Sequence, residues 1–197
     1  MKIIGLTGGI GSGKSKALTF FKEKGIPCYQ ADKAGHRVLN EDKDVIEKVK
    51  AHFGANLYTE KGLDRKSLGA YVFKNPEALA YLNSIVHPAV RKDFKEFIQD
   101  QQAPFVISEV AILFENEGQA QYDKIILITA PVLLRIKRVQ ERDQVLEEEI
   151  RARIKKQWPD SKKASLADYV VTNAADWSTT EAELQKVYED LLLFSQQ

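Results

Sequence analysis

The feature that most constrains the fold of this chain lies near its start, in the run Gly8-Gly9-Ile10-Gly11-Ser12-Gly13-Lys14-Ser15. This run matches the pattern G-x-x-x-x-G-K-[ST], which is typical of a phosphate-binding loop. Glycines let the backbone turn tightly and approach a polyphosphate closely, because no Cβ atom stands in the way. The amide groups then face the phosphate oxygens, and the helix that follows presents its positive end to them. The run therefore predicts a site for a nucleoside triphosphate.

The sequence on either side of the loop supports this interpretation. Residues 2–6 form a short apolar run, as expected of a buried parallel strand. Residues 16–24 read as a helix that Gly25 ends. A strand, a loop and a helix in this order are the context that the motif requires. Within it, the Lys14 ammonium is expected to reach the β- and γ-phosphates, and the Ser15 hydroxyl to join the coordination sphere of Mg²⁺.

Strands and helices alternate along the rest of the chain, which predicts an α/β protein with a parallel sheet. Four more strands are expected at residues 26–30, 105–110, 124–129 and 168–171. Residues 40–100 have helical spacing and no strand signal, so we expect a helical insertion there, with Pro88 kinking or breaking its long helix. Ser178 and Glu181 predict a capping box at the start of the last helix.

Composition excludes several classes of protein. The 29 basic and 28 acidic residues give a net charge of +1, so no global field attracts nucleic acid. No segment approaches the ~18 apolar residues of a membrane span, and the N-terminus does not read as a signal peptide. The single cysteine, Cys28, excludes an internal disulfide framework and reads as a small buried hydrophobe. We therefore expect a cytoplasmic protein without nucleic-acid or membrane partners.

Asp32 follows the second predicted strand directly. In an open parallel sheet ligands lie outside the carboxyl ends of the strands, so Asp32 is expected at the same edge as the phosphate loop. A carboxylate there can accept a proton from an attacking hydroxyl. Alternatively, Asp32 caps a helix over residues 33–39, a position that aspartate favours. Its position in the sequence alone favours neither interpretation.

Basic side chains gather in residues 135–156. Arg138 and Arg142 are four residues apart and share one face of a helix. On composition alone, a solvated pair of helices with internal ion pairs is the first explanation. The functional explanation is a lid, because phosphoryl transfer needs water excluded and the γ-phosphate charge stabilised by arginine.

The loop alone does not separate kinases, GTPases and ATPases. The chain lacks the Asn/Thr-Lys-x-Asp element that guanine recognition needs, and it is shorter than motor or transporter ATPases. A small-molecule kinase fits better. Two alternatives stay open: a nucleoside or nucleoside-monophosphate kinase on the same scaffold, and a regulatory nucleotide-binding module without transfer activity.

Several spaced motifs, in order, resemble the dephospho-coenzyme A kinase family over nearly the whole chain. The opening Leu6-Thr7-Gly8-Gly9-Ile10-Gly11 is similar to the family's form of the loop, and Asp32 matches the second aspartate of its Asp-Ala-Asp motif. The remaining matches are His87-Pro88, Leu113-Phe114-Glu115, Arg138, Arg142-Asp143, Gln157 and the run from Ala167 to Asn173.

This resemblance implies ATP-dependent phosphorylation of the ribose 3′-hydroxyl of dephospho-coenzyme A, the last step of coenzyme A synthesis. It implies a P-loop NTPase fold of the nucleotide-kinase type, with a five-stranded parallel sheet flanked by helices. One domain is expected, with its core at about residues 1–39, 101–135 and 158–197. A helical coenzyme-binding insertion is expected at about 40–100 and a helical lid at about 136–157. We expect a monomer or a weak homo-oligomer.

The resemblance also assigns roles to residues. The expected catalytic residues are Asp32 as general base, Lys14, Arg138 and Arg142. The expected nucleotide-binding residues are Gly9, Gly11, Ser12, Gly13, Lys14, Ser15, Lys16 and Asn173. The expected contacts with the coenzyme are Asp32, Arg65, His87, Leu113 and Glu115. The expected Mg²⁺ ligands are Ser15 and Glu109. For His87 a purely structural role before Pro88 is an equal alternative.

Three positions depart from the family pattern. Gln30 replaces the first aspartate of Asp-Ala-Asp, which leaves one carboxylate there. Glu109 stands where the family often has aspartate, and Ala111 where it has proline. The longer side chain of Glu109 can still hold Mg²⁺ through water, while Gln30 rules out a paired-carboxylate arrangement with Asp32.

Overall fold

The structure is a computed structural model that describes all 197 residues. The chain divides into two compact units. The first, which we call the phosphate-loop unit, consists of Met1–Gln30 and Gln101–Gln197. The second, the helical unit, consists of Ala31–Asp100. No helix in either unit is both long enough and apolar enough to cross a bilayer.

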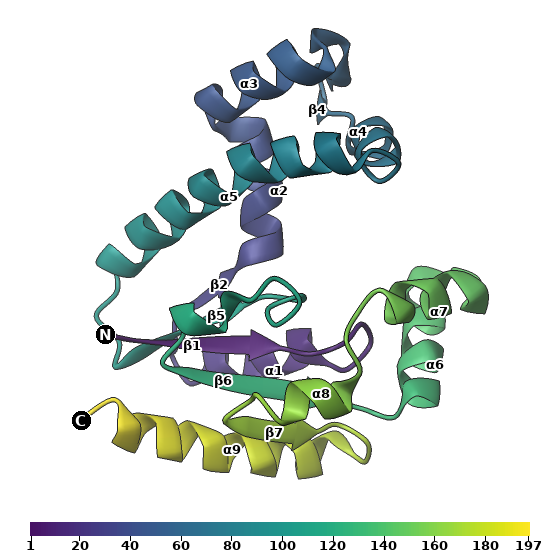
Figure 1. Cartoon of the computed structure of the whole chain (residues 1–197). Coiled ribbons are helices and arrows are strands. Elements are labelled where there is room, and N and C mark those ends of the chain that lie inside the picture. The colour runs from purple at the N-terminus through teal and green to yellow at the C-terminus, as the bar shows by residue number, and fades with distance from the viewer. The chain divides into compact units, whose positions relative to one another are not determined.

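The phosphate-loop unit is built on one parallel sheet (Figure 1). Its strands are β1 (Lys2–Thr7), β2 (Cys28–Gln30), β5 (Phe105–Glu109), β6 (Lys124–Thr129) and β7 (Tyr169–Thr172). They lie in the order β2-β5-β1-β6-β7, and every neighbouring pair is parallel. The phosphate loop follows β1 at the centre of the sheet, so it emerges at the carboxyl edge where ligands bind in sheets of this kind.

Helices and loops cover both faces of this sheet. Ile126 and Ile128 of β6 pack in one cluster with residues of α1 (Lys14–Glu23) and α9 (Trp177–Phe194). Ile125, whose side chain alternates with theirs, packs in a separate cluster with Leu113 and Trp158. Alternate side chains of a strand point to opposite faces, so burial on both sides explains the continuous apolar runs that the sequence showed.

A helical hairpin follows β6. It consists of α6 (Val132–Asp143) and α7 (Glu147–Lys155), and the short helix α8 (Asp160–Ala164) comes after it. Ile136, Val139 and Ile150 form the apolar cluster between α6 and α7. Gln144 ends α6 in the left-handed region, with φ of 53°, which turns the chain toward α7. A short 3₁₀ helix, Gly118–Gln121, precedes β6.

The helical unit has its own apolar core. Its elements are α2 (Ala31–Glu41), α3 (Lys43–Phe53), a 3₁₀ turn (Ala55–Leu57), β3 (Tyr58–Thr59), β4 (Gly62–Leu63), α4 (Arg65–Val72) and α5 (Pro76–Gln99). Asp42, Asp64 and Asn75 cap α3, α4 and α5 through side-chain oxygens. Val49 and Leu68 are buried in the core that these helices share.

The predicted fold class is confirmed, since the sheet is parallel, has five strands and is flanked by helices. Three local expectations were wrong. The helix over Pro88 is not broken, because α5 runs from Pro76 to Gln99. The insertion contains a two-strand hairpin, β3 with β4. The last helix begins at Trp177, before the predicted capping box, and Ser178 caps nothing.

Candidate active site

The phosphate loop joins β1 to α1, and its backbone requires glycine at two points. Gly11 and Gly13 have φ of 77° and 104°, in the left-handed region that only glycine adopts readily. A Cβ atom on Gly13 would lie 2.1 Å from the side-chain nitrogen of Asn173, and one on Gly11 would lie 2.6 Å from the carbonyl oxygen of Arg135. These glycines therefore admit other parts of the protein against the loop, in addition to the phosphate that the sequence suggested.

The inner backbone of the loop offers donors to an anion. No hydrogen bond within the protein uses the amides of Gly11 or Gly13. The Ser12 amide, in contrast, donates to the Gly9 carbonyl at 3.1 Å, and the Ser12 side chain is fully buried. Gly13 precedes α1 without a side-chain cap, so the positive end of that helix is open to a ligand. The predicted nucleotide contact of Ser12 stays a prediction.

The Lys14 ammonium lies over the loop. Its Nζ donates to the carbonyl oxygens of Gly8 at 2.8 Å and Gly9 at 3.5 Å. This places a positive charge against the segment that the sequence assigned to phosphate. Lys16, which was also assigned to the nucleotide, is exposed and lies 4.2 Å from the ring centroid of Trp177.

Two polar side chains lie where β2 and β5 end. Gln30 and Glu109 are register partners in the sheet, and the Gln30 amide donates to one carboxylate oxygen of Glu109 at 2.9 Å. The departure of Gln30 from the family pattern therefore creates an amide–carboxylate pair that the sequence did not reveal. The other Glu109 oxygen and the Ser15 hydroxyl take part in no hydrogen bond within the protein. The structure contains no group of three or more His, Cys, Asp or Glu side chains arranged to hold a metal.

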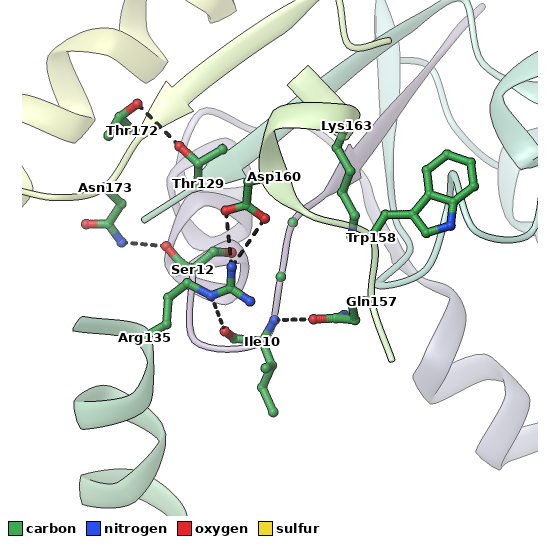
Figure 2. Close-up of polar contacts among 12 residues, drawn as sticks. Ile10, Ser12, Thr129, Arg135, Gln157, Trp158, Asp160, Lys163, Thr172 and Asn173 are labelled. Atoms are coloured by element: carbon green, nitrogen blue, oxygen red, sulfur yellow. Dashed lines mark hydrogen bonds and ion pairs between the residues drawn. The ribbon is translucent and has the colours of Figure 1, made fainter. Parts of the chain in front are cut away.

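Arg138 is held against the loop through Asn173. Its guanidinium donates to the backbone carbonyl of Asn173 at 3.1 Å and to its side-chain oxygen at 3.2 Å. The Asn173 amide nitrogen donates in turn to the Ser12 carbonyl at 2.9 Å (Figure 2). Arg138 and Asn173, expected at separate parts of the nucleotide site, thus form one network around the loop. Asn173 is buried, so its predicted contact with nucleotide stays a prediction.

Arg142 lies at the end of α6 and pairs with its neighbour. Its guanidinium donates to both carboxylate oxygens of Asp143, at 2.6 and 2.9 Å. These hydrogen bonds lower the pKa of Asp143 and raise that of Arg142. Arg142 is exposed, so in this structure it fits the explanation of a solvated helix with internal ion pairs. Its predicted role in stabilising the transferring phosphoryl group stays a prediction.

Asp32 lies in the first turn of α2, two residues after β2 ends at Gln30. The helix begins at Ala31, so Asp32 does not cap it, and the alternative explanation of this residue as a cap of residues 33–39 was wrong. His36 lies one turn further along the same helix. The negative charge of Asp32 tends to raise the pKa of this histidine.

The predicted coenzyme contacts of the helical unit lie on its helices. The Arg65 guanidinium is 2.6 Å from the His36 ring nitrogen Nε2. Partial burial, and then the Arg65 charge, lower the pKa of His36 despite Asp32. Partial burial and Arg91 lower the pKa of His87. Both imidazoles are therefore neutral at pH 7 and can accept or donate a hydrogen bond. Contact of Arg65 or His87 with a substrate stays a prediction.

Leu113 and Glu115 have internal partners. Leu113 is 1% exposed and lies in the apolar cluster beside the sheet. Glu115 Oε1 lies 2.7 Å from the fully buried Lys163 ammonium and accepts a hydrogen bond from the Trp158 amide at 2.9 Å. These contacts give both residues a role in packing, and their predicted contact with substrate stays a prediction.

The sequence alone did not identify Arg135 as a residue that holds the phosphate loop in place. Arg135 is 3% exposed and bonds the Ile10 carbonyl and Asp160. Neither partner is near it in the sequence, so no local pattern indicates these bonds. The one available signal was the placement of Arg135 at helical spacing with Arg138 and Arg142, which the sequence left open between a solvated helix and a lid.

The sheet, the loop and its unused amides define a nucleotide-binding protein of the P-loop class. A model of the dephospho-CoA kinase family matches residues 2–179. The dephospho-CoA kinase of Staphylococcus haemolyticus is 38% identical over 194 residues, which cover 97% of this chain and 94% of that protein.

Two solved structures are similar to this chain in both sequence and fold. The dephospho-CoA kinase from Campylobacter jejuni is 30% identical with a TM-score of 0.72, over 96% of each chain. The structure of TT1252 from Thermus thermophilus is 33% identical with a TM-score of 0.87, over 96% of this chain and 97% of that one. The chain therefore belongs to the dephospho-CoA kinase family, and the resemblance seen in its motifs is confirmed.

Proposed function

We propose that this chain transfers the γ-phosphoryl group of ATP to the ribose 3′-hydroxyl of dephospho-coenzyme A, giving coenzyme A and ADP. Membership of the dephospho-CoA kinase family supports the choice of acceptor. The observation that carries the transfer chemistry is the loop, whose Gly11 and Gly13 amides have no acceptor in the protein. An anion with several oxygens is the ligand that such a loop stabilises.

In this proposal the loop binds the ATP phosphates through the amides of Gly11, Gly13 and Ser15. The Lys14 ammonium, already against the loop carbonyls, neutralises charge on the β- and γ-phosphates. Arg138 and Arg142 stabilise the charge of the transferring group from α6. Phosphoryl transfer asks the protein mainly for positioning and electrostatic stabilisation, and this arrangement can supply both.

The residues present also fit Mg²⁺. A hydroxyl and a carboxylate are the hard oxygen ligands that this ion prefers, usually with several waters. Ser15 would hold it directly, and Glu109 would hold it through water with the oxygen that Gln30 does not occupy. When bound, Mg²⁺ would supply positive charge that stabilises the phosphate oxygens as negative charge develops on them. Gln30 keeps the Glu109 carboxylate oriented and adds no second negative charge.

Asp32 is the proposed general base, which accepts the proton of the 3′-hydroxyl as that oxygen attacks phosphorus. Its support is threefold. It matches the second aspartate of the family motif. It follows the carboxyl end of β2 by two residues. It is also not consumed as a helix cap. Arg65 and His87 are the proposed contacts with the phosphates of the coenzyme.

The test is ADP release with a panel of acceptors in the presence of ATP and Mg²⁺. Dephospho-coenzyme A is expected to give rapid turnover, while AMP and free nucleosides give none above background hydrolysis. Turnover with AMP or a nucleoside, but not with dephospho-coenzyme A, would assign the chain to the competing kinase class. Tight ATP binding without ADP release under any acceptor would favour a regulatory module.

We further propose that the chain works in the cytoplasm as a monomer or weak homo-oligomer. A single free cysteine is consistent with a reducing compartment. Burial raises the pKa of its thiol to about 12, so Cys28 is a neutral packing group at physiological pH. Sedimentation over a range of protein concentrations tests the association state, and a stable tetramer would contradict it.

A further inference from the structure

Ile10 is the one large apolar side chain in the phosphate loop, at a position that the phosphate-binding pattern leaves open. Its side chain packs against the apolar cluster of Ile136, Val139 and Ile150, between α6 and α7. Part of the phosphate loop thus belongs to the core of the helical hairpin. Nothing in the chemistry of phosphate binding requires this contact.

The backbone of Ile10 is held from the same side. Its amide donates to the Gln157 side-chain oxygen at 2.9 Å, just beyond the end of α7. Its carbonyl accepts from the Arg135 Nε at 2.8 Å, in α6 (Figure 2). One residue therefore engages both helices of the hairpin and the segment that follows it.

That segment, Gln157–Lys163, is fixed at several points. The Asp160 carboxylate pairs with the buried Arg135 guanidinium, at 3.1 and 3.2 Å. The Trp158 amide and the Lys163 ammonium both bond Glu115, which lies beyond β5. A buried ion pair contributes strongly to specific geometry once it is formed, because separating the partners leaves a charge uncompensated.

Helix α6 packs closely against the phosphate loop. A Cβ atom on Gly9 would lie 2.2 Å from the Arg135 guanidinium nitrogen Nη2, and one on Gly11 would lie 2.6 Å from the Arg135 carbonyl. Close-packed interiors transmit displacements rather than absorb them. A shift of α6 must therefore move the backbone of residues 9–11, a segment that ends with the first of the proposed phosphate-binding amides, that of Gly11.

We propose that Ile10 is a positioning residue that couples the α6–α7 hairpin to the phosphate loop. The docked hairpin holds the Gly11 and Gly13 amides in their phosphate-binding orientation, and it does so through the side chain and both backbone groups of Ile10. Because coupling is reciprocal, nucleotide on the loop stabilises the docked hairpin in return. This inference rests on the proposed use of the loop for ATP.

The experiment is calorimetric titration of the full chain with ADP, together with KM for ATP and kcat. Ile10→Ala is expected to weaken ADP binding about tenfold and to raise KM for ATP similarly, the loss that about 1.4 kcal/mol of positioning energy produces. Ile10→Val keeps most of the apolar contact and stays within about twofold of the parent, on the small scale expected of that substitution. Leu191→Ala is the control: it creates a cavity in the same unit, in the α9 cluster, and lowers Tm without changing ADP affinity.

A double-mutant cycle separates coupling from general destabilisation. Val139→Ala, on the hairpin side of the contact, is expected to weaken ADP binding by itself. Combined with Ile10→Ala it weakens binding no further, because both changes break one contact, whereas independent sites add. Leu191→Ala combined with Ile10→Ala is expected to be additive in stability and to bind ADP as Ile10→Ala alone does, with no further loss of affinity.

Wild-type ADP affinity in Ile10→Ala, or additive losses with Val139→Ala, would overturn the proposal. If Ile10→Ala does not fold, Gln157→Ala decides, because it removes only the acceptor of the Ile10 amide. A loss of about threefold supports the coupling, on the scale of one hydrogen bond, and unchanged affinity overturns it. ADP binding needs no acceptor, so these outcomes are independent of whether dephospho-coenzyme A is the substrate.

Discussion

The two units of this protein hold their candidate functional residues in different ways. In the phosphate-loop unit the side chains around the nucleotide site already bond one another. Arg138 bonds Asn173, which bonds the loop at Ser12, and Gln30 orients Glu109. In the helical unit the candidate Arg65 is exposed at the start of α4, and its guanidinium lies 2.6 Å from the His36 ring.

This contrast indicates that the proposed nucleotide side is preorganised, while the proposed acceptor side would rely on long side chains that a ligand can reorient. Preorganised donors stabilise a charge without a cost of ordering at the moment of binding. Flexible cationic side chains adapt to a large substrate at the cost of that ordering. Changes in the loop are therefore expected to have larger effects than changes in the helical unit.

The largest effect is expected from Gly13→Ala. Its Cβ atom would lie 2.1 Å from the Asn173 nitrogen at a φ of 104°, so the loop must distort. We expect ADP affinity in calorimetry to fall by a factor of about 100 or more, because the overlap with the Asn173 nitrogen adds to the about 1–2 kcal/mol that backbone strain alone costs. Gly25→Ala is a matched control, because Gly25 has φ of 77° but no atom within 4 Å of its Cβ position. Similar ADP affinities in the two variants would contradict a preorganised loop.

Asp32→Asn sharpens the comparison at the start of the helical unit. Removing a general base is expected to lower kcat by about 100-fold or more. ADP affinity should stay within about twofold of the parent, because the proposed role of this carboxylate is to accept the proton of the acceptor hydroxyl and not to bind the nucleotide. Initial rates with saturating dephospho-coenzyme A and ATP measure kcat, and calorimetric titration measures ADP affinity. Near-normal turnover in this variant would show that Asp32 is not the base.

Arg65→Ala probes the acceptor side. We expect KM for dephospho-coenzyme A to rise about tenfold, because a charge-assisted hydrogen bond contributes about 1.5–3 kcal/mol. KM for ATP should not change. Lys66→Ala, an exposed neighbour in the first turn of α4, is the control and should leave both constants near the parent values. An equal rise in both KM values would place Arg65 outside the acceptor site.

The smallest effect concerns pH. All three histidines, His36, His52 and His87, lie in the helical unit. The pKa values of His36 and His87 are lowered in the folded state, chiefly by burial. The unfolded chain therefore binds protons first as pH falls below about 6.5, and stability decreases there. Hydrogen exchange at pH 7 and 5.5, corrected for intrinsic rates, should show lost protection in α2 and α5 and little change in β1 and α1. Equal loss in both units would contradict this assignment.

Much of the fold could be predicted because its signals are local. The strand, loop and helix around residues 2–24 follow from apolar runs and glycine positions. The Asp42 side chain accepts a hydrogen bond from the Val45 amide and caps α3, which is also a local contact. The predicted break at Pro88 failed because tertiary packing of α5 outweighs the cost of one missing donor.

The site could be predicted only in part, because its support is not local. The loop was visible in the sequence, but the bond from Asn173 to Ser12 joins residues 161 positions apart. The Arg135–Asp160 pair depends on the docking of α8, a short helix without a sequence signal. The capping box at residue 178 failed because α9 begins one residue earlier, at Trp177, which places Ser178 inside the helix.

The measurement that tests the account most directly is a single turnover with γ-labelled ATP, dephospho-coenzyme A and excess enzyme. The account predicts that the label appears on the ribose 3′-oxygen of coenzyme A in one exponential phase, and that Asp32→Asn slows this phase without changing the site of transfer. Label released as inorganic phosphate, or transferred to another acceptor in preference, would contradict it.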